Sequence, residues 1–131
     1  MEKSIYKLKF YGEDYELLGV YSHYVDNETL AVVLVEKDTF EPFADITVNL
    51  PISMATKTLA YVDTNNSEWV EKFLKDNKIA QPTGEYGFSG FCSYPLYEFD
   101  LTKLMSEEEF AKLGGKWKWV RKDWVKLQLI W

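Results

Sequence analysis

The segment around which we expect the fold to be organised is Gly84-Glu-Tyr-Gly-Phe-Ser-Gly-Phe-Cys-Ser-Tyr-Pro-Leu-Tyr-Glu-Phe-Asp100. It holds three glycines, six aromatic residues and the only cysteine of the chain. Glycine at every third position lets the backbone bend or adopt positive φ between large rings. Pro95 then favours extended backbone, so we predict a shaped loop that leads into a strand over residues 96–100. The alternative is that the rings simply fill the core beneath a long loop.

Five segments before it have strand character. Apolar and polar residues alternate over residues 5–11 and 43–50, the pattern of a half-buried strand. Residues 30–35 form an unbroken aliphatic run that suits a central strand, and residues 15–24 and 59–62 complete the set. Short polar turns separate the first four segments, so we predict an antiparallel meander.

Two helices are predicted. Trp69, Val70, Phe73 and Leu74 form one apolar stripe within residues 67–77, and Asn65 with Glu68 has the spacing of a capping box. We expect this amphipathic helix to pack on one face of the sheet. A second, shorter helix over 107–113 begins with a Ser106–Glu109 capping box and ends at Gly114-Gly115.

The C-terminal segment 116–131 contains four of the five tryptophans and fits two structures. A hairpin with its turn at 121–123 matches the alternation, whereas Trp117, Trp124 and Trp131 also recur at heptad spacing. We favour the hairpin because aromatic and β-branched residues dominate and no helix cap precedes Trp117. The predicted fold is therefore α+β: one domain over residues 1–131, with an antiparallel sheet of five or more strands, one helix on its face and a C-terminal hairpin.

The charge of the chain is unevenly distributed. Residues 1–115 contain 20 acidic and 10 basic residues, whereas residues 116–131 contain one acidic and five basic residues. The acidic character of residues 1–115 argues against nucleic-acid binding through the main surface of the protein and favours a basic partner. No apolar run approaches the length of a membrane span, and the start of the chain lacks the apolar core of a signal peptide. With a single cysteine, these features predict a cytoplasmic protein.

No catalytic or cofactor motif is present. Cys92 and the single histidine, His23, are too few for a structural zinc site, and nothing in the sequence brings them together as a catalytic dyad. The Asp63-x-Asn65-x-Ser67 spacing starts like a calcium loop, but it lacks the glycine and the final glutamate that such a loop needs. The glycine spacing fits neither a dinucleotide nor a P-loop fingerprint. The sequence therefore specifies no enzyme, no metal site and no cofactor.

Residues 58–101 resemble a known group of proteins. Ala60-Tyr-Val-Asp-Thr-Asn-Asn66, the following helix and Ser89-Gly-Phe-Cys-Ser-Tyr-Pro-Leu-Tyr-Glu-Phe99 are similar to small proteins grouped as a domain of unknown function. Those proteins are met mostly in phages and in integrated or conjugative elements of Gram-positive gut bacteria. The resemblance implies a small accessory protein that interferes with a host defence complex or helps to maintain the element. It supplies no catalytic residues.

We therefore predict a non-enzymatic interaction protein of a mobile element that inhibits a basic, nucleic-acid-binding host complex such as a CRISPR effector. An acidic surface and three aromatic anchors would make the contact: Glu13, Asp14, Glu16, Asp26, Glu28, Glu36, Asp38 and Glu41, with Tyr86, Phe88 and Tyr97. One alternative is a small enzyme or ligand-binding module with its pocket at Gly84–Tyr94. Another is single-stranded nucleic-acid binding through the basic, tryptophan-rich tail.

Overall fold

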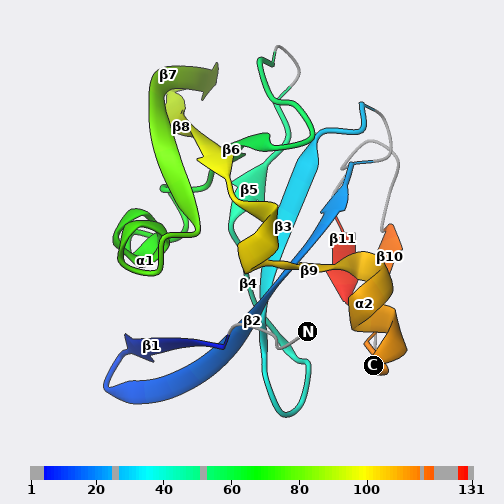
Figure 1. Cartoon of the computed structure of the whole chain (residues 1–131). Coiled ribbons are helices and arrows are strands. Elements are labelled where there is room, and N and C mark those ends of the chain that lie inside the picture. Colours follow the sequence, from blue (N-terminus) through cyan, green and yellow to red (C-terminus); the bar gives the residue numbers. More distant parts are fainter. Residues whose placement is uncertain (1–4, 25–26, 51–52, 116, 120–126, 130–131) are drawn as a thin grey trace.

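A first antiparallel sheet is built on the N-terminal half of the chain in the computed structural model, which describes residues 5–24, 27–50, 53–115, 117–119 and 127–129 (Figure 1). Its strands lie in the order β1-β2-β3-β4, and the short strand β9 pairs with β2 in parallel beside the end of β1. The strand bounds are β1 Tyr6–Phe10, β2 Glu13–His23, β3 Leu30–Glu36, β4 Pro42–Asp45 and β9 Met105–Ser106.

A second antiparallel sheet has the order β5-β6-β8-β7. Its bounds are β5 Thr47–Val48, β6 Leu59–Val62, β7 Ala80–Ser89 and β8 Cys92–Phe99. Strand β7 is therefore at the edge of this sheet. Two further strands, β10 (Trp117–Trp119) and β11 (Leu127–Leu129), pair with each other antiparallel, which is the hairpin arrangement of the tail and not the helical one. The proposed turn at 121–123 lies outside the described residues.

The helices are short. Helix α1 spans Val70–Asp76 and buries Val70, Phe73 and Leu74, while α2 spans Glu107–Lys112 and buries Phe110. A single 3₁₀ turn, η1, covers Leu101–Lys103. The capping box predicted at the start of α2 is present, because the Ser106 side chain accepts from the Glu109 amide and the Glu109 side chain accepts from the Ser106 amide.

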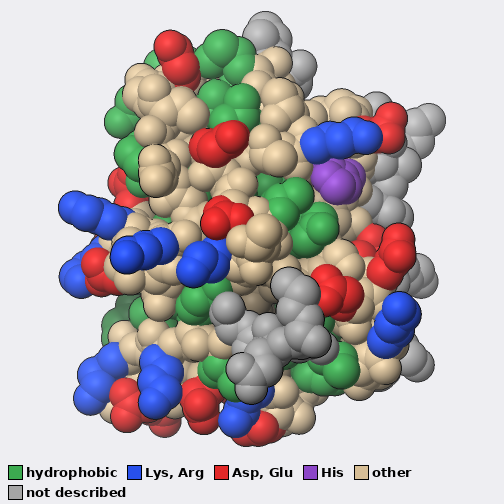
Figure 2. Space-filling view, viewed as in Figure 1, with side chains coloured by type: hydrophobic (Ala, Val, Ile, Leu, Met, Phe, Trp, Pro, Cys, Tyr) green, Lys and Arg blue, Asp and Glu red, His purple; other side chains and the backbone are tan. Residues whose placement is uncertain are grey.

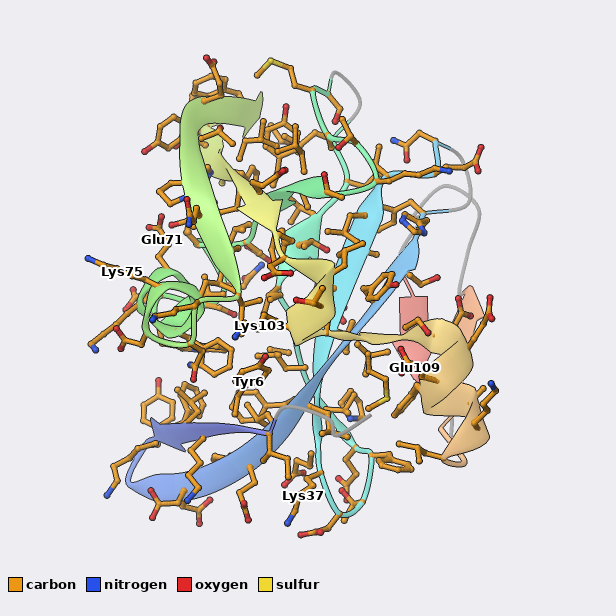
Figure 3. All side chains as sticks on the ribbon, in the orientation of Figure 1. Tyr6, Lys37, Glu71, Lys75, Lys103 and Glu109 are labelled. Carbon is orange, nitrogen blue, oxygen red and sulfur yellow. The ribbon has the colours of Figure 1, made fainter. Side chains whose placement is uncertain are left out.

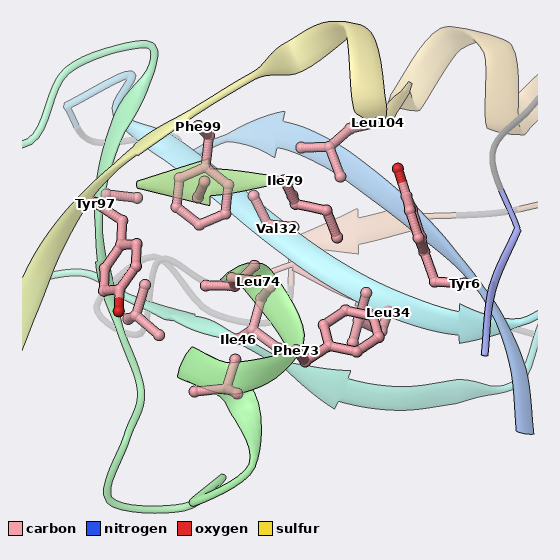
Figure 4. Packing of buried hydrophobic residues seen from close by; sticks show 14 of the residues in the cluster. Tyr6, Val32, Leu34, Ile46, Phe73, Leu74, Ile79, Tyr97, Phe99 and Leu104 are labelled. Atoms are coloured by element: carbon pink, nitrogen blue, oxygen red, sulfur yellow. The ribbon is translucent and has the colours of Figure 1, made fainter. Parts of the chain in front are cut away.

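The main hydrophobic core lies between the two sheets and α1 (Figure 4). Val32 and Leu34 enter it from the first sheet, Tyr97 and Phe99 from the second, and Phe73 from the helix. A second cluster on the other face of the first sheet packs Val33 and Val35 of β3 against Met105 and Phe110. Strand β3 is consequently buried on both faces, as its unbroken aliphatic sequence predicts.

The chain passes from one sheet to the other at Ile46, which is fully buried between β4 and β5. The Ile46 amide donates to the Val32 carbonyl, and the Asp63 amide donates to the Ile46 carbonyl. Next to it, the Thr47 hydroxyl accepts from the Val32 amide. These bonds connect β3 of the first sheet to Asp63, which directly follows β6 of the second.

The predicted α+β class is wrong. The chain is mostly strand, with two helices of seven and six residues, and its strands form two principal sheets instead of one. The helix predicted over 67–77 begins only at Val70, because the Asp63 carboxylate accepts from the Asn66 amide and side chain and holds the preceding residues in a turn. Trp69 occupies the N-cap without a side-chain cap, so the predicted Asn65–Glu68 capping box is also wrong.

The segment 84–100 is a hairpin and not a loop that leads into a strand. Gly84 to Ser89 belong to β7, and a two-residue turn at Gly90-Phe91 connects β7 to β8. Gly90 has φ +60°, and glycine is the residue favoured at the first position of such a turn when that position needs positive φ.

Within the described residues, no helix has both the length and the apolar content that crossing a membrane requires.

Gly87 provides a test of the packing of β7. A Cβ atom at this position would lie 2.4 Å from Leu50 Cδ1 and 2.6 Å from Tyr61 Cε1, so Gly87 faces a filled layer. We expect Gly87→Ala to lower the free energy of unfolding by about 1 to 3 kcal/mol, because Tyr61 is buried and must move. The measurement is urea unfolding, with Ser89→Ala in the exposed part of the same strand as the control. Equal stability of the two variants would contradict this packing.

Candidate protein-binding surface

The predicted acidic residues are partly gathered by the fold. Six of them lie where β2 begins, β3 ends and the β3–β4 turn follows, and we call this group the acidic end: Glu13, Asp14, Glu16, Glu36, Asp38 and Glu41. Glu28 lies in the β2–β3 connection, at the opposite end of these strands. Asp26 is outside the described residues.

One face of the acidic end is largely neutralised. Asp14 and Glu16 share a face of the β1–β2 hairpin with Lys7 and Lys9, because residues in a strand alternate between faces. Lys9 Nζ lies 3.8 Å from Asp14 Oδ1. Lys37, labelled at the lower end of Figure 3, lies 3.5 Å from Glu16 and 3.7 Å from Asp38. Figure 2 shows basic and acidic side chains interspersed there, so this face offers little net field.

The other face of the hairpin combines carboxylates with aromatic rings. The Tyr15 hydroxyl donates to Glu13 Oε2 at 3.0 Å. That hydrogen bond, followed by burial and the charges of Glu13 and Glu36, raises the pKa of Tyr15. No lysine within the described residues forms an ion pair with Glu13 or Glu36. The negative charge of this face is therefore not offset locally.

Five rings, which we call the aromatic cluster, lie on this same face: Phe10, Tyr11, Tyr15, Phe43 and Trp69. Ring centroids are 4.4 Å apart for Phe10–Tyr11, 5.6 Å for Phe10–Phe43 and 5.7 Å for Phe43–Trp69. All except Tyr11 are partly buried, and Tyr15, Phe43 and Trp69 pack against the main core. The cluster therefore runs from solvent to the core at Phe73, 5.7 Å from Trp69.

Tyr11 is the most unusual member of the cluster. It is 92% exposed and occupies the β1–β2 turn with φ +50°, followed by Gly12 with φ +80°. Positive φ at both central positions is the pattern of a type I′ turn, for which asparagine and glycine are the favoured residues. A tyrosine there is strained and leaves a large ring in water.

Two of the predicted aromatic anchors, Tyr86 and Phe88, lie away from the acidic end. Tyr86 is 55% exposed, Phe88 is 69% exposed, and Phe91 in the turn is fully exposed. They belong to the β7–β8 hairpin, whose tip lies at the end of the molecule opposite the β1–β2 turn in Figure 1. The fold thus does not place these anchors beside the acidic end.

Tyr97, the third predicted anchor, is only 4% exposed and belongs to the main core. Its hydroxyl donates to Glu71 Oε1 of α1 at 2.5 Å. Burial, followed by this hydrogen bond and the charge of Glu71, raises the pKa of Tyr97 well above its usual range. We therefore leave Tyr97 out of the candidate surface.

The alternative pocket region contains Cys92, which is partly buried next to Tyr94. Burial first, and then the proximity of Cys92 and Asp63, raises the pKa of Tyr94. Nε2 of His23 is buried without a hydrogen-bond partner among the described residues, so it does not engage the Cys92 thiol. Within the same residues no group of three His, Cys, Asp or Glu side chains is arranged to hold a metal ion.

Two grooves lie outside the Gly84–Tyr94 segment. One, of about 1020 Å³, separates α1 from the first residues of β7 and includes Glu71, Lys75, Lys78 and Gln81. Another, of about 490 Å³, lies at the acidic end between Lys7, Lys9, Asp14 and Tyr15.

Binding of single-stranded nucleic acid through the basic tail stays a prediction, because the structure does not describe the side chains of residues 116–131.

Sequence reasoning missed the aromatic cluster. Phe10, Phe43 and Trp69 belong to three separate predicted elements, two strands and a helix, and nothing in the local patterns brings these elements together. One signal was available, because Tyr11 directly precedes Gly12 at a position where a tight hairpin favours asparagine.

A family model described as domain of unknown function DUF4313 matches residues 18–114 of this chain. The match extends beyond residues 58–101 in both directions, and β1 with the first residues of β2 lies outside it. No curated protein and no solved structure matches the chain.

The Tyr97–Glu71 bond leads to a prediction about alkaline pH. Removing the hydroxyl in Tyr97→Phe should lower the free energy of unfolding by about 1 kcal/mol near neutral pH. Because the folded-state pKa of Tyr97 is raised, its contribution is complete below the unfolded pKa of about 10 and is lost as pH rises above that value.

The difference between wild type and Tyr97→Phe should therefore shrink when urea unfolding is repeated at about pH 11. Tyr86→Phe, which alters an exposed tyrosine, is the control and should match the wild type at neutral pH. A gap that stays constant across this pH range would show that the hydroxyl is not held as described.

Proposed function

We propose that this chain, which belongs to the DUF4313 family of domains of unknown function, is a non-enzymatic interaction protein that binds a basic partner through its acidic end. The contact surface is the aromatic cluster together with Glu13 and Glu36. Tyr11 is its exposed anchor, and Phe10, Phe43 and Trp69 form the apolar base behind it.

The single observation that carries this proposal is the conformation of Tyr11. An L-residue in the left-handed region costs about 1 kcal/mol, and its ring gains little from the 4.4 Å contact with Phe10 while 92% of the residue is exposed. Asparagine in the same turn would be less strained. A strained and exposed ring is explained if a partner buries it.

The chemistry of the surface selects the partner. Carboxylates beside aromatic faces bind arginine and lysine side chains through ion pairs and cation–π contacts together. Glu13 and Glu36 supply the charge, and Tyr11 and Trp69 supply the rings. Buried aromatic anchors with a charged rim are also the usual composition of protein-binding hot spots. A basic protein surface therefore fits better than a metabolite.

The finer form of the proposal concerns biological context. The resemblance of residues 58–101 to proteins of phages and conjugative elements supports a mobile-element origin, and the acidic surface suits competition with nucleic acid. We therefore propose a cytoplasmic inhibitor of a nucleic-acid-binding host defence complex such as a CRISPR effector. The chain would occupy a basic surface that otherwise holds phosphates.

Tyr11→Asn separates a binding role from a structural one. Asparagine tolerates the left-handed backbone, so we expect the free energy of unfolding to rise by about 0.5 to 1 kcal/mol, measured by urea unfolding. The same substitution removes the anchor and should weaken partner binding roughly tenfold or more. A stabilised variant with unchanged binding would overturn the role of Tyr11.

The partner can be sought with three matched proteins. Wild type, Tyr11→Asn and Phe91→Asn are immobilised, and bacterial lysate freed of nucleic acid is passed over each. Phe91→Asn changes an equally exposed ring at the other end of the molecule. We expect a basic protein retained by wild type and Phe91→Asn but lost from Tyr11→Asn. If no basic protein shows this pattern, the proposal fails.

The purified partner then permits a test of the electrostatic contribution and of inhibition. Affinity should fall at least tenfold between about 50 and 500 mM NaCl, because the carboxylates are near the surface. The chain should also reduce the nucleic-acid binding of the partner, measured by fluorescence anisotropy. Affinity that does not change with salt would contradict the acidic contact, and undiminished nucleic-acid binding would contradict inhibition.

A further inference from the structure

The outer edge of β7 is a second binding surface that the proposed function does not use. The strand is last in the order β5-β6-β8-β7, so within the described residues no strand pairs with its outer side. Helix α1 packs near its beginning, beside the groove at Gln81 and Pro82, and its second half extends past the helix (Figure 1). An open edge of this kind can pair with another strand.

The last four residues of β7, 86–89, lack the features that normally block such pairing. Proteins protect open edges with lysines, prolines, β-bulges or charges that point inward. Strand β7 has such an irregularity between Pro82 and Tyr86, where its register with β8 shifts. Residues 86–89 follow this irregularity, pair regularly with β8 and contain no lysine, no proline and no carboxylate. They instead present Tyr86 and Phe88, exposed by 55% and 69%, on the face opposite to the one on which Gly87 contacts Leu50 and Tyr61.

We propose that the occupant of this edge is a second copy of the chain, which pairs β7 with β7 antiparallel about a two-fold axis at Gly87. In this register Tyr86 of each copy lies opposite Phe88 of the other copy, on the same face. Four exposed rings thus form two identical cross-strand pairs, as a two-fold interface requires. Residues 86–89 carry no charged side chain, so no like charges oppose each other in this register.

The distribution of charge also favours this arrangement. The chain has a net charge of −6, and two copies repel each other when their acidic surfaces approach. The acidic end and the β7–β8 tip lie at opposite ends of the molecule, so pairing through β7 keeps the two acidic ends far apart (Figure 1). Both acidic ends then remain available to a partner.

This dimer and the proposed partner binding differ in their response to salt. Added salt screens the repulsion between two acidic copies, so dimerisation should become tighter or stay constant. Binding of a basic partner at the acidic end should weaken under the same conditions. Failure of one proposal is therefore distinguishable from failure of the other.

The test is sedimentation velocity of the full chain over a concentration series. We expect a reversible monomer–dimer equilibrium with micromolar affinity, because an edge contact of this size is small. Tyr86→Lys/Phe88→Lys and Tyr86→Glu/Phe88→Glu should each be monomeric, since each places like charges opposite each other. An equimolar mixture of the two variants should restore a dimer, because the register then pairs lysine with glutamate.

Tyr11→Asn is the matched control and should dimerise like the wild type. Hydrogen exchange adds a measurement that needs no variant, in which the amides of residues 85–89 gain protection as wild-type concentration rises. A wild type that stays monomeric at high micromolar concentration would overturn the proposal. The proposal would also be overturned if the lysine variant formed dimers or if the mixture of variants remained monomeric. Amide exchange in β7 that does not change with protein concentration would contradict it as well.

Discussion

Six consecutive aliphatic residues, Leu30 to Val35, cannot leave either face of a strand in water without a large loss of hydrophobic stabilisation. Strand β3 therefore has to be covered on both of its faces. One face, with Val32 and Leu34, packs into the core shared with the second sheet, and the other, with Val33 and Val35, packs against Phe110 of α2. Each fully buried side chain of this size contributes about 1.5 to 3 kcal/mol.

The two sheets are held together where the chain crosses between them. Ile46 is fully buried, and its backbone bonds join Val32 of the first sheet to Asp63 beside the second. The Thr47 hydroxyl satisfies the Val32 amide and contacts the Tyr24 hydroxyl at 3.0 Å. Buried polar groups are costly unless paired, so these bonds specify where the strand predicted over 43–50 must divide.

This architecture separates two aromatic surfaces. The aromatic cluster lies at the acidic end of the first sheet, and the rings of the β7–β8 hairpin lie at the far end of the second. The first surface combines rings with carboxylates that have no lysine partner among the described residues, whereas the second is nearly uncharged. Their different chemistry explains why we assign one to a basic partner and the other to a second copy.

Local sequence patterns determined most of the individual elements. Alternation in residues 5–11, the aliphatic run at 30–35 and the Ser106–Glu109 capping box correspond to β1, β3 and the start of α2, because each depends on contacts within a few residues. The pairing of β10 with β11 likewise agrees with the alternating, aromatic-rich tail. The acidic character of the N-terminal half could also be read directly from the sequence.

Only the tertiary structure decided how these elements combine. The division into two sheets at Ile46, the burial of Tyr97 and the separation of Tyr86 from the acidic end depend on contacts between residues distant in sequence. The aromatic cluster forms for the same reason, since Phe10, Phe43 and Trp69 meet only when two strands and the start of a helix converge. Hydrophobic attraction has no direction, so a sequence shows that rings will be buried or gathered but not which rings will meet.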